Sequence, residues 1–304
     1  MTNADPMQIF DRVQVRKHRD RAARFSLLKP NPFRQDPTKP NPAKNSFLNH
    51  NALFEEIAER LVDRLFDLKR DLPRVLDIGC HDGAVSRLLA GKKGVERLVS
   101  ADLSPDMARL TASLNATQPN TASSVLVADE EFLPFADHSF DAVVSNLSLH
   151  WVNDLPGALI QIRRALRPDG FFLAALFGRE TLRELRRSLM DAELELRGGV
   201  SPRISPFPDL ADAAGLLQRA GFLLPVADRD VITATYRDPF KLMKELRGMG
   251  ETNALRTRDR RTPPPALFLE TAHRYAEQFS EDHQIVATFE VVYLAGWSPP
   301  TNQE

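Results

Sequence analysis

Strand-like and helix-like segments alternate through the middle of the chain, and this alternation restricts the fold more than any other feature of the sequence. Apolar runs rich in Val, Leu and Phe are separated by stretches with helical patterning. The runs are RVLDIG (74–79), RLVSAD (97–102), SVLVAD (124–129), FDAVVSN (140–146) and GFFLAALF (170–177), and the helical patterns span 83–91, 105–114 and 154–166. The pattern predicts an α/β fold with a doubly wound, mostly parallel sheet.

An N-terminal arm, residues 1–50, is predicted before this sheet. Residues 9–25 are basic, with a few apolar positions, and we interpret them as a solvated helix. Residues 29–42 repeat proline, which cannot join helix or sheet hydrogen bonding, and predict a mobile or extended connector. A helix is expected over residues 53–68, where leucines and an isoleucine recur at helical spacing.

The rest of the chain, residues 51–304, is predicted to form one domain. Residues 51–180 would make its cofactor-binding half and residues 181–304 its substrate-side half, which contains a charged helical insertion. A chain of 304 residues is long enough to bury a sizeable core in this way.

Composition narrows the class of protein. The formal net charge of −1 gives no global electrostatic reason to bind nucleic acid. No apolar run approaches the roughly 18 residues that a bilayer span needs, and the N-terminus lacks the apolar core of a signal peptide. Cys80, the single cysteine, excludes an internal disulfide and a thiolate zinc cluster, and it is expected to serve packing. We expect a soluble intracellular protein, cytoplasmic in a bacterium or in the mitochondrial matrix of a eukaryote.

Acidic residues lie at the expected carboxyl ends of three strands, where open α/β sheets bind their ligands. Asp77 lies inside the first strand, Asp102 closes the second and Asp129 closes the third. The loop from Gly79 to Gly83 does not match the G-x-G-x-x-G turn of dinucleotide folds. Carboxylates beside a phosphate would cost about 4 kcal/mol at an effective dielectric near 20, whereas a cation would be attracted.

S-adenosylmethionine has the groups that these carboxylates require. Its ammonium group suits the region of Asp77, its ribose diol suits Asp102, and its adenine amine suits Asp129. Asn146, after the fourth strand, is placed to touch the same ligand. The predicted cofactor-binding residues are Asp77, Gly79, Gly83, Asp102, Leu103, Asp129, Glu130 and Asn146. No metal site is predicted.

Four segments in order, VLDIGCHDG, SADLSPDM, ADEEFLPF and SFDAVVSNLSLHWVNDLPGALIQIRRALRPDGFF, resemble class I S-adenosylmethionine-dependent methyltransferases. The resemblance implies a Rossmann-like, seven-stranded sheet. The sequence departs from that family at His81, where glycine is common. Histidine tolerates positive φ better than most residues, so the turn can still form, although the side chain narrows the approach to the methionine moiety of the cofactor.

A narrower resemblance covers nearly the whole chain. IFDR, SLSLHWVNDLPGAL, FGRETLRELRRSL, GGVSPRISPF, LMKELRGMGETNA and VVYLAGW are similar to the mitochondrial complex I assembly factor five family and its bacterial relatives. This likeness implies a protein substrate, the iron-sulfur subunit of respiratory complex I beside the quinone site, and hydroxylation of one of its arginines.

The residues alone leave the chemistry open between methylation and hydroxylation. Hydroxylation commonly uses iron held by two histidines and a carboxylate, or a flavin, and the sequence alone indicates neither. Its single H-x-D pair, His18 with Asp20, has no second histidine near it in the sequence. Methyl transfer asks mainly for orientation of an already activated sulfonium.

Catalytic candidates follow the fourth predicted strand. His150 and Trp151 are placed to face substrate, although a lone histidine is often structural and an aromatic residue near a helix start often belongs to the core. The stretch RGMGETN could close over a substrate, and it adds Arg247, Glu251 and Asn253 as positions to test. The basic segment that follows is either a partner-docking lid or a plain surface.

Three functions are compatible with the sequence. The first is an S-adenosylmethionine-binding enzyme that modifies a complex I subunit. The second is methyl esterification of a malonyl thioester on a carrier protein, because ADEEFLPF and the W-x-NDLPGAL stretch are also similar to the biotin-pathway methyltransferase. The third is an assembly chaperone that binds the cofactor without turnover. Oligomeric state and contact with a membrane surface stay open.

Overall fold

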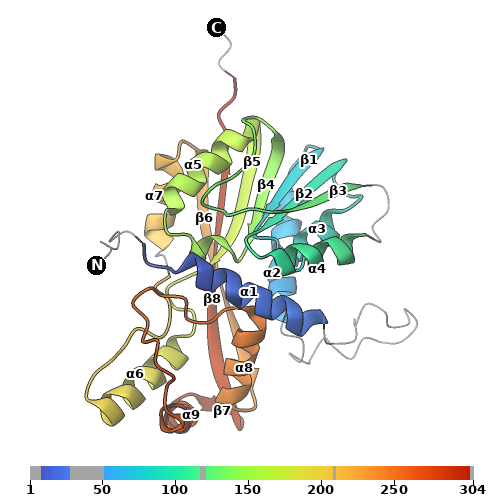
Figure 1. Cartoon of the computed structure of the whole chain (residues 1–304). Coiled ribbons are helices and arrows are strands. Elements are labelled where there is room, and N and C mark those ends of the chain that lie inside the picture. Colours follow the sequence, from blue (N-terminus) through green and yellow to red (C-terminus); the bar gives the residue numbers. More distant parts are fainter. Residues whose placement is uncertain (1–7, 28–50, 117–120, 208–209, 302–304) are drawn as a thin grey trace, which may run out of the picture.

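The computed structural model describes residues 8–27, 51–116, 121–207 and 210–301, which fold around one mixed sheet (Figure 1). The order of the strands is β3-β2-β1-β4-β5-β8-β6, and the two-residue β7 pairs with β8. The strands are β1 (Arg74–Ile78), β2 (Arg97–Asp102), β3 (Ala122–Val127), β4 (Phe140–Asn146), β5 (Leu166–Phe177), β6 (Leu223–Tyr236), β7 (Ser280–Glu281) and β8 (Gln284–Trp297). The predicted proline-rich connector at 29–42 lies outside the described residues.

Strands β1 to β5 pair in parallel, and β8 runs antiparallel between β5 and β6. The predicted doubly wound, mostly parallel sheet is therefore confirmed. Two boundaries differ from the expectation: β3 ends at Val127, two residues before Asp129, and β5 begins at Leu166 rather than at 170.

Helices cover both faces of the sheet, as parallel strands require. The helices before β5 are α1 (Arg12–Leu27), α2 (Ala52–Phe66), α3 (Ala84–Leu89), α4 (Pro105–Asn115), the short 3-10 helix Leu149–Trp151 and α5 (Leu155–Ala165). Those after β5 are α6 (Arg183–Arg197), α7 (Leu210–Arg219), α8 (Pro239–Met249) and α9 (Pro265–Gln278). Ser104 and Asp154 cap α4 and α5 by accepting backbone N–H bonds, so the predicted starts of these helices are confirmed by local chemistry.

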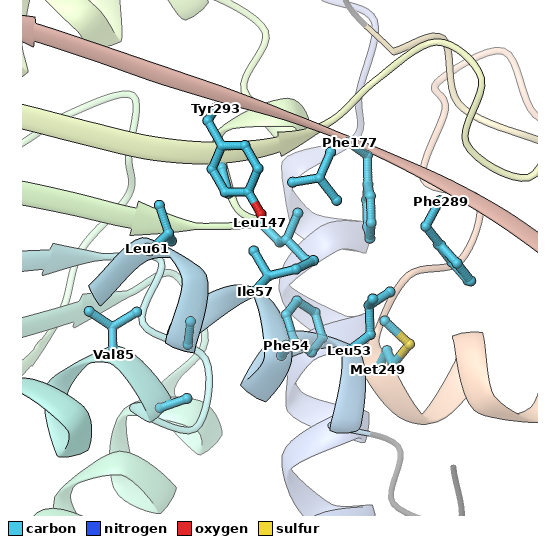
Figure 2. Packing of buried hydrophobic residues seen from close by; sticks show 14 of the residues in the cluster. Leu53, Phe54, Ile57, Leu61, Val85, Leu147, Phe177, Met249, Phe289 and Tyr293 are labelled. Atoms are coloured by element: carbon cyan, nitrogen blue, oxygen red, sulfur yellow. The ribbon is translucent and has the colours of Figure 1, made fainter. Parts of the chain in front are cut away.

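The core consists of two layers, one on each face of the sheet, and the strands supply side chains to them alternately. Phe171, Leu173 and Ala175 of β5 join the layer under α2, whereas Phe172 and Ala174 join the layer under α5 and α7. Figure 2 shows the first layer, in which Leu53, Phe54, Ile57 and Leu61 of α2 lie against Leu147, Phe177 and Tyr293. A rigid layer of this kind fixes where the ends of the strands lie.

The second half of the chain extends the sheet beyond its parallel part. Strands β6 and β8 are long, and α6, α8 and α9 gather around their far ends (Figure 1). Helix α1 lies between this group and the ends of the parallel strands (Figure 1). Within the described residues, no helix is both long enough and apolar enough to cross a bilayer.

The interpretation of residues 9–25 as a solvated helix is wrong. Ala22 and Ala23 of α1 pack against Met107 and Leu110 of α4, and Arg19 is only 2% exposed. Ile9, Val13 and Phe25, three of the apolar residues that stand out in the sequence, are exposed, whereas Phe10 is buried. The hydropathy pattern gave the wrong prediction of burial because the buried face of α1 consists mostly of small and charged residues.

Candidate cofactor site at the ends of the parallel strands

The loop after β1 has the backbone that a close approach of a ligand requires. Gly79, His81 and Gly83 all adopt positive φ, of 64°, 50° and 79°. The expectation that histidine tolerates this turn is therefore confirmed. The N–H groups of Gly79 and Cys80 donate to Ala101 O at 2.7 and 3.0 Å, which ties the loop to β2.

Asp102 ends β2 and holds the neighbouring loop through backbone hydrogen bonds. Its carboxylate accepts the His81 N–H at 3.1 Å and the Ser104 N–H at 2.7 Å. The side chain is fully buried. Leu103, the next residue, is partly buried and packs on the small cluster around Trp151 and Phe10. Asp102 is thus rigidly placed at the mouth of the sheet, as predicted from the strand pattern.

Glu130 is the most heavily engaged carboxylate of the site. Arg19 Nη1 lies 2.7 Å from its Oε1, the Ser148 hydroxyl donates to Oε1 at 2.6 Å, and Arg12 pairs with Oε2. Burial alone would raise the pKa of Glu130, but the guanidinium groups of Arg19 and Arg12 outweigh burial and hold that pKa far below its ordinary value. Glu130 is therefore an ionised carboxylate in the interior.

Arg19 connects this carboxylate to Asp102. Its Nη1 is 3.5 Å from both carboxylate oxygens of Asp102, and its Nη2 donates to Ser148 Oγ at 2.7 Å. A Cβ built on Gly79 would overlap the side chain of Ser148, so Ser148 lies directly against the loop. The two side chains together contact the loop, Asp102 and Glu130.

Sequence reasoning missed Arg12, Arg19 and Ser148. A signal for the two arginines was present, because positions seven apart lie on the same face of a helix after about two turns. Nothing in the sequence indicated that this face meets carboxylates, since Arg19 and Glu130 are separated by 111 positions. Ser148 stood within the segment already favoured for the active site.

Asp77 lies deeper than the other predicted site residues. Its Oδ2 accepts the Ser86 hydroxyl at 2.8 Å, and Ser86 Oγ is 2.7 Å from Ser100 Oγ. Its Oδ1 is buried without a hydrogen-bond partner among the described residues. Burial raises the pKa of Asp77 to about 7, and the nearby charge of Asp102 adds to that increase. The predicted contact of Asp77 with an ammonium group stays a prediction.

Two other predicted cofactor residues flank the loop. Asp129 forms an isolated bridge with Phe132, and its carboxylate is paired with Arg12. Asn146 ends β4, donates through Nδ2 to Phe54 O at 2.9 Å and leaves its Oδ1 buried without a partner among the described residues. The direct role of each in binding a cofactor stays a prediction.

His81 occupies a closed environment rather than a free position over the loop. Its ring lies against Phe54 with centroids 4.4 Å apart, and its Nε2 is 3.1 Å from Leu147 O. Burial, followed by the charge of Arg19, lowers the pKa of His81, so the ring is neutral at pH 7.

The predicted catalytic pair meets a carboxylate from the loop after α8. His150 Nε2 lies 3.2 Å from Glu251 Oε2, and Trp151 Nε1 donates to the same oxygen at 3.1 Å. Burial would raise the pKa of Glu251, but the interaction with His150 outweighs it and lowers that pKa. The structure therefore brings together three residues that the sequence proposed from two separate segments.

The remaining candidates of the RGMGETN stretch lie elsewhere. Asn253 donates to Pro202 O at 2.9 Å, and Arg247 is exposed on α8. In the basic segment that follows, Arg258 pairs with Asp11, which fastens the segment to the start of α1. In the part of the chain that the structure describes, no group of three or more His, Cys, Asp or Glu side chains is arranged to hold a metal ion.

Comparisons with known proteins agree with this geometry. A family model described as a methyltransferase domain matches residues 76–174, which contain β2 to β4 and most of β1 and β5. The arginine-hydroxylase NDUFAF5 of Rattus norvegicus mitochondria is 41% identical over 303 residues, covering 97% of this chain and 79% of the relative. Its human counterpart is 40% identical over the same shares. The chain belongs to the NDUFAF5 family.

A second group of relatives is more distant. The malonyl-[acyl-carrier protein] O-methyltransferase of Xylella fastidiosa is 35% identical over 258 residues, covering 84% of this chain and 85% of the relative. Among solved structures, the YcgJ protein of Bacillus subtilis superposes with a TM-score of 0.55 at 16% identity, covering 80% of this chain and 98% of that one. NDUFAF5 family membership and the methyltransferase domain confirm the predicted methyltransferase-type fold and the class of cofactor, S-adenosylmethionine.

The residue types at this site fit this cofactor, and in this structure Arg19 lies beside the carboxylate of Asp102. A loop with positive φ and a buried carboxylate at the end of β2 are the parts that an S-adenosylmethionine site needs. In this structure Arg19 contacts the carboxylate of Asp102, and Ser148 lies against the loop.

Proposed function

We propose that this protein modifies an arginine of a protein subunit during assembly of respiratory complex I, by hydroxylation as the name of its mitochondrial relatives states, with dioxygen and a two-electron donor as co-reactants. The observation that carries the proposal is the extent of the likeness, 41% identity over 97% of the chain. This likeness extends far beyond the methyltransferase domain at 76–174 and includes the second half, where enzymes of this fold differ from one another.

The carboxyl ends of β1 to β4 supply the proposed S-adenosylmethionine site. Asp102 would hold the ribose diol, since a fully buried carboxylate with two backbone donors has a fixed orientation. The positive-φ loop would hold the methionine moiety. The residues that would contact the cofactor are part of this proposal. In this structure the carboxylates of Asp102 and Asp129 pair with arginines of α1 instead.

We assign Glu251 to the substrate side of the site. It is ionised at neutral pH and is held by His150 and Trp151, so it is suited to orient a guanidinium group. His150 and Trp151 would then act by positioning Glu251. This arrangement supports an arginine substrate more directly than a malonyl carboxylate, which Glu251 would repel.

The decisive measurement is mass spectrometry of the complex I iron-sulfur subunit coexpressed with this protein. We expect one added oxygen on one arginine, present with the wild-type chain and absent with Asp102→Ala. Asp106→Ala is the matched control, because Asp106 lies on the same segment but contacts Arg24 and Arg109 at the surface. Circular dichroism of each variant would verify that loss of modification is not loss of fold.

The alternative outcomes separate the remaining functions. One added methyl would replace hydroxylation by protein arginine methylation. Methyl ester formation on a malonyl carrier protein, with an unmodified complex I subunit, would favour the second function, which the 35% identity to the Xylella relative supports. Tight retention of the unmodified subunit would favour a chaperone. A mitochondrial matrix or bacterial cytoplasmic location follows from the first function and is part of the same proposal.

A further inference from the structure

We propose that α1 is an internal plug of the cofactor site, and that α1 must withdraw before S-adenosylmethionine binds. The inference rests on the proposed cofactor and concerns how access to its site is controlled. Arg19 is the residue that closes the site, because it engages the same carboxylates that the cofactor requires.

The geometry shows a competition for Asp102. A ribose diol recognised by this carboxylate needs both of its oxygens, and Arg19 Nη1 lies 3.5 Å from each of them. The same guanidinium reaches Glu130 at 2.7 Å and Ser148 at 2.7 Å, so it spans the site from side to side. A ligand cannot contact Asp102 and the loop while Arg19 keeps these bonds.

The charges explain why an arginine can fill the site reversibly. Asp102 and Glu130 are fully buried, and uncompensated carboxylates in the interior are costly. Arg19 and Arg12 supply the compensating positive charge in this conformation. S-adenosylmethionine is itself cationic, so it can replace part of that charge when α1 leaves. S-adenosylhomocysteine lacks the sulfonium charge and should displace α1 less effectively.

The interface that holds α1 contains few apolar contacts. Apart from Phe10, Val15 and two alanines, it consists of polar pairs such as Asp20 with Ser104 and Phe10 N–H with Asn153 Oδ1 at 2.7 Å. The apolar residues of this segment belong to two small clusters that are separate from the two core layers of the sheet. The α1 helix therefore has the composition of an element that can leave without unfolding the sheet.

The first test compares Arg19→Met with Arg16→Met by calorimetric titration with S-adenosylmethionine. Both substitutions remove an arginine from α1, but Arg16 is exposed. Because a closed state reduces apparent affinity by the fraction of open molecules, we expect Arg19→Met to bind at least about 10-fold tighter than wild type. Arg16→Met should bind as wild type does. Unchanged or weaker binding by folded Arg19→Met overturns the proposal.

The second test uses the wild-type protein and does not depend on the stability of a variant. Hydrogen exchange is measured on peptides from residues 12–27 with and without saturating S-adenosylmethionine. We expect faster exchange in α1 when the cofactor is bound. S-adenosylhomocysteine should give the same increase only at a higher ligand concentration. Slower or unchanged exchange would overturn the plug, and slower exchange would indicate that α1 covers the bound cofactor.

The two tests distinguish this inference from the proposed function. If wild type binds the cofactor and α1 gains protection, only the plug fails. If neither wild type nor folded Arg19→Met binds S-adenosylmethionine, the proposed cofactor fails and the plug fails with it.

Discussion

Asp77 and Glu130 are both fully buried carboxylates at the ends of the parallel strands, but they lie in opposite electrostatic environments. Asp77, between β1 and α3, has hydroxyl partners, and burial raises its pKa to about 7. Glu130, under α1, has two guanidinium partners that hold its pKa far below normal, although burial opposes them. The difference shows that burial does not decide ionisation by itself, because the cation supplied by α1 reverses its effect.

The largest effect is expected when Glu130 is removed. Glu130→Ala leaves the buried guanidinium of Arg19 with Asp102, at the longer distance of 3.5 Å, as its carboxylate partner, so the free energy of unfolding should fall by about 3–5 kcal/mol. Glu56→Ala is the control, since Glu56 is 49% exposed and pairs with Arg60 on the surface of α2, where changes stay within about 0.5 kcal/mol. Urea denaturation measures both. Equal losses in the two variants would contradict the comparison.

A second prediction concerns Gly79, which lies between the two environments. Gly79→Ala introduces both backbone strain and an overlap with Ser148, the residue that Arg19 and Glu130 hold in place. Gly198→Ala has the same strain, with φ of 67°, but its Cβ would meet nothing within 4 Å. We expect Gly198→Ala to cost about 1–2 kcal/mol and Gly79→Ala at least about 2 kcal/mol more. Thermal and urea unfolding of the pair would separate strain from overlap, and similar losses would show that Ser148 moves aside freely.

The sequence was sufficient to predict the surroundings of Asp77, because the sequence signals for β1 and the following loop are local. Apolar runs located β1, β2 and β4, and the glycines located the turn whose positive φ the structure confirms. The carboxylates at the strand ends followed from the rule that parallel strands place their carboxyl ends at one edge.

The surroundings of Glu130 under α1 could not be predicted from the sequence, because the contacts there are made by charged side chains from distant segments. Arg19 meets Asp102 across 83 positions, and Glu251 meets His150 across 101. Neither contact has a periodic pattern. The interpretation of α1 as solvated failed for the same reason: a helix that buries arginines against carboxylates has the composition of a surface helix.

A third prediction tests the raised pKa of Asp77. A carboxyl group whose pKa is higher in the folded state than its ordinary 3.8 contributes to stability. This contribution is complete below pH 3.8 and is lost as the pH rises to about 7. The asparagine in Asp77→Asn cannot ionise, so the free energy of unfolding of this variant should rise relative to that of wild type between about pH 4 and pH 7. At pH 8 the variant should be more stable by roughly 1–3 kcal/mol. Urea midpoints at several pH values measure the difference.

The sign of this effect is what distinguishes Asp77 from Glu130. The lowered pKa of Glu130 gives stability that is present above its ordinary value of 4.5 and is lost only as pH falls below it. Neutralising Glu130 should therefore cost stability throughout pH 5–8, whereas neutralising Asp77 should add stability toward pH 8. If the difference in stability between Asp77→Asn and wild type is the same at every pH, Asp77 does not lose a proton in this range.

The smallest effect is expected at the other end of α1. Arg24 pairs with Asp106 at 2.9 Å, but its side chain is 71% exposed, so water and salt screen the pair. Arg24→Met should change the free energy of unfolding by no more than about 0.5 kcal/mol and leave cofactor affinity unchanged. If Arg24→Met instead tightened S-adenosylmethionine binding as much as Arg19→Met, the hold on α1 would be distributed along the whole helix. Arg19 would then be one contact among several, and control of the site would depend on the docking of α1 as a unit rather than on the competition for Asp102.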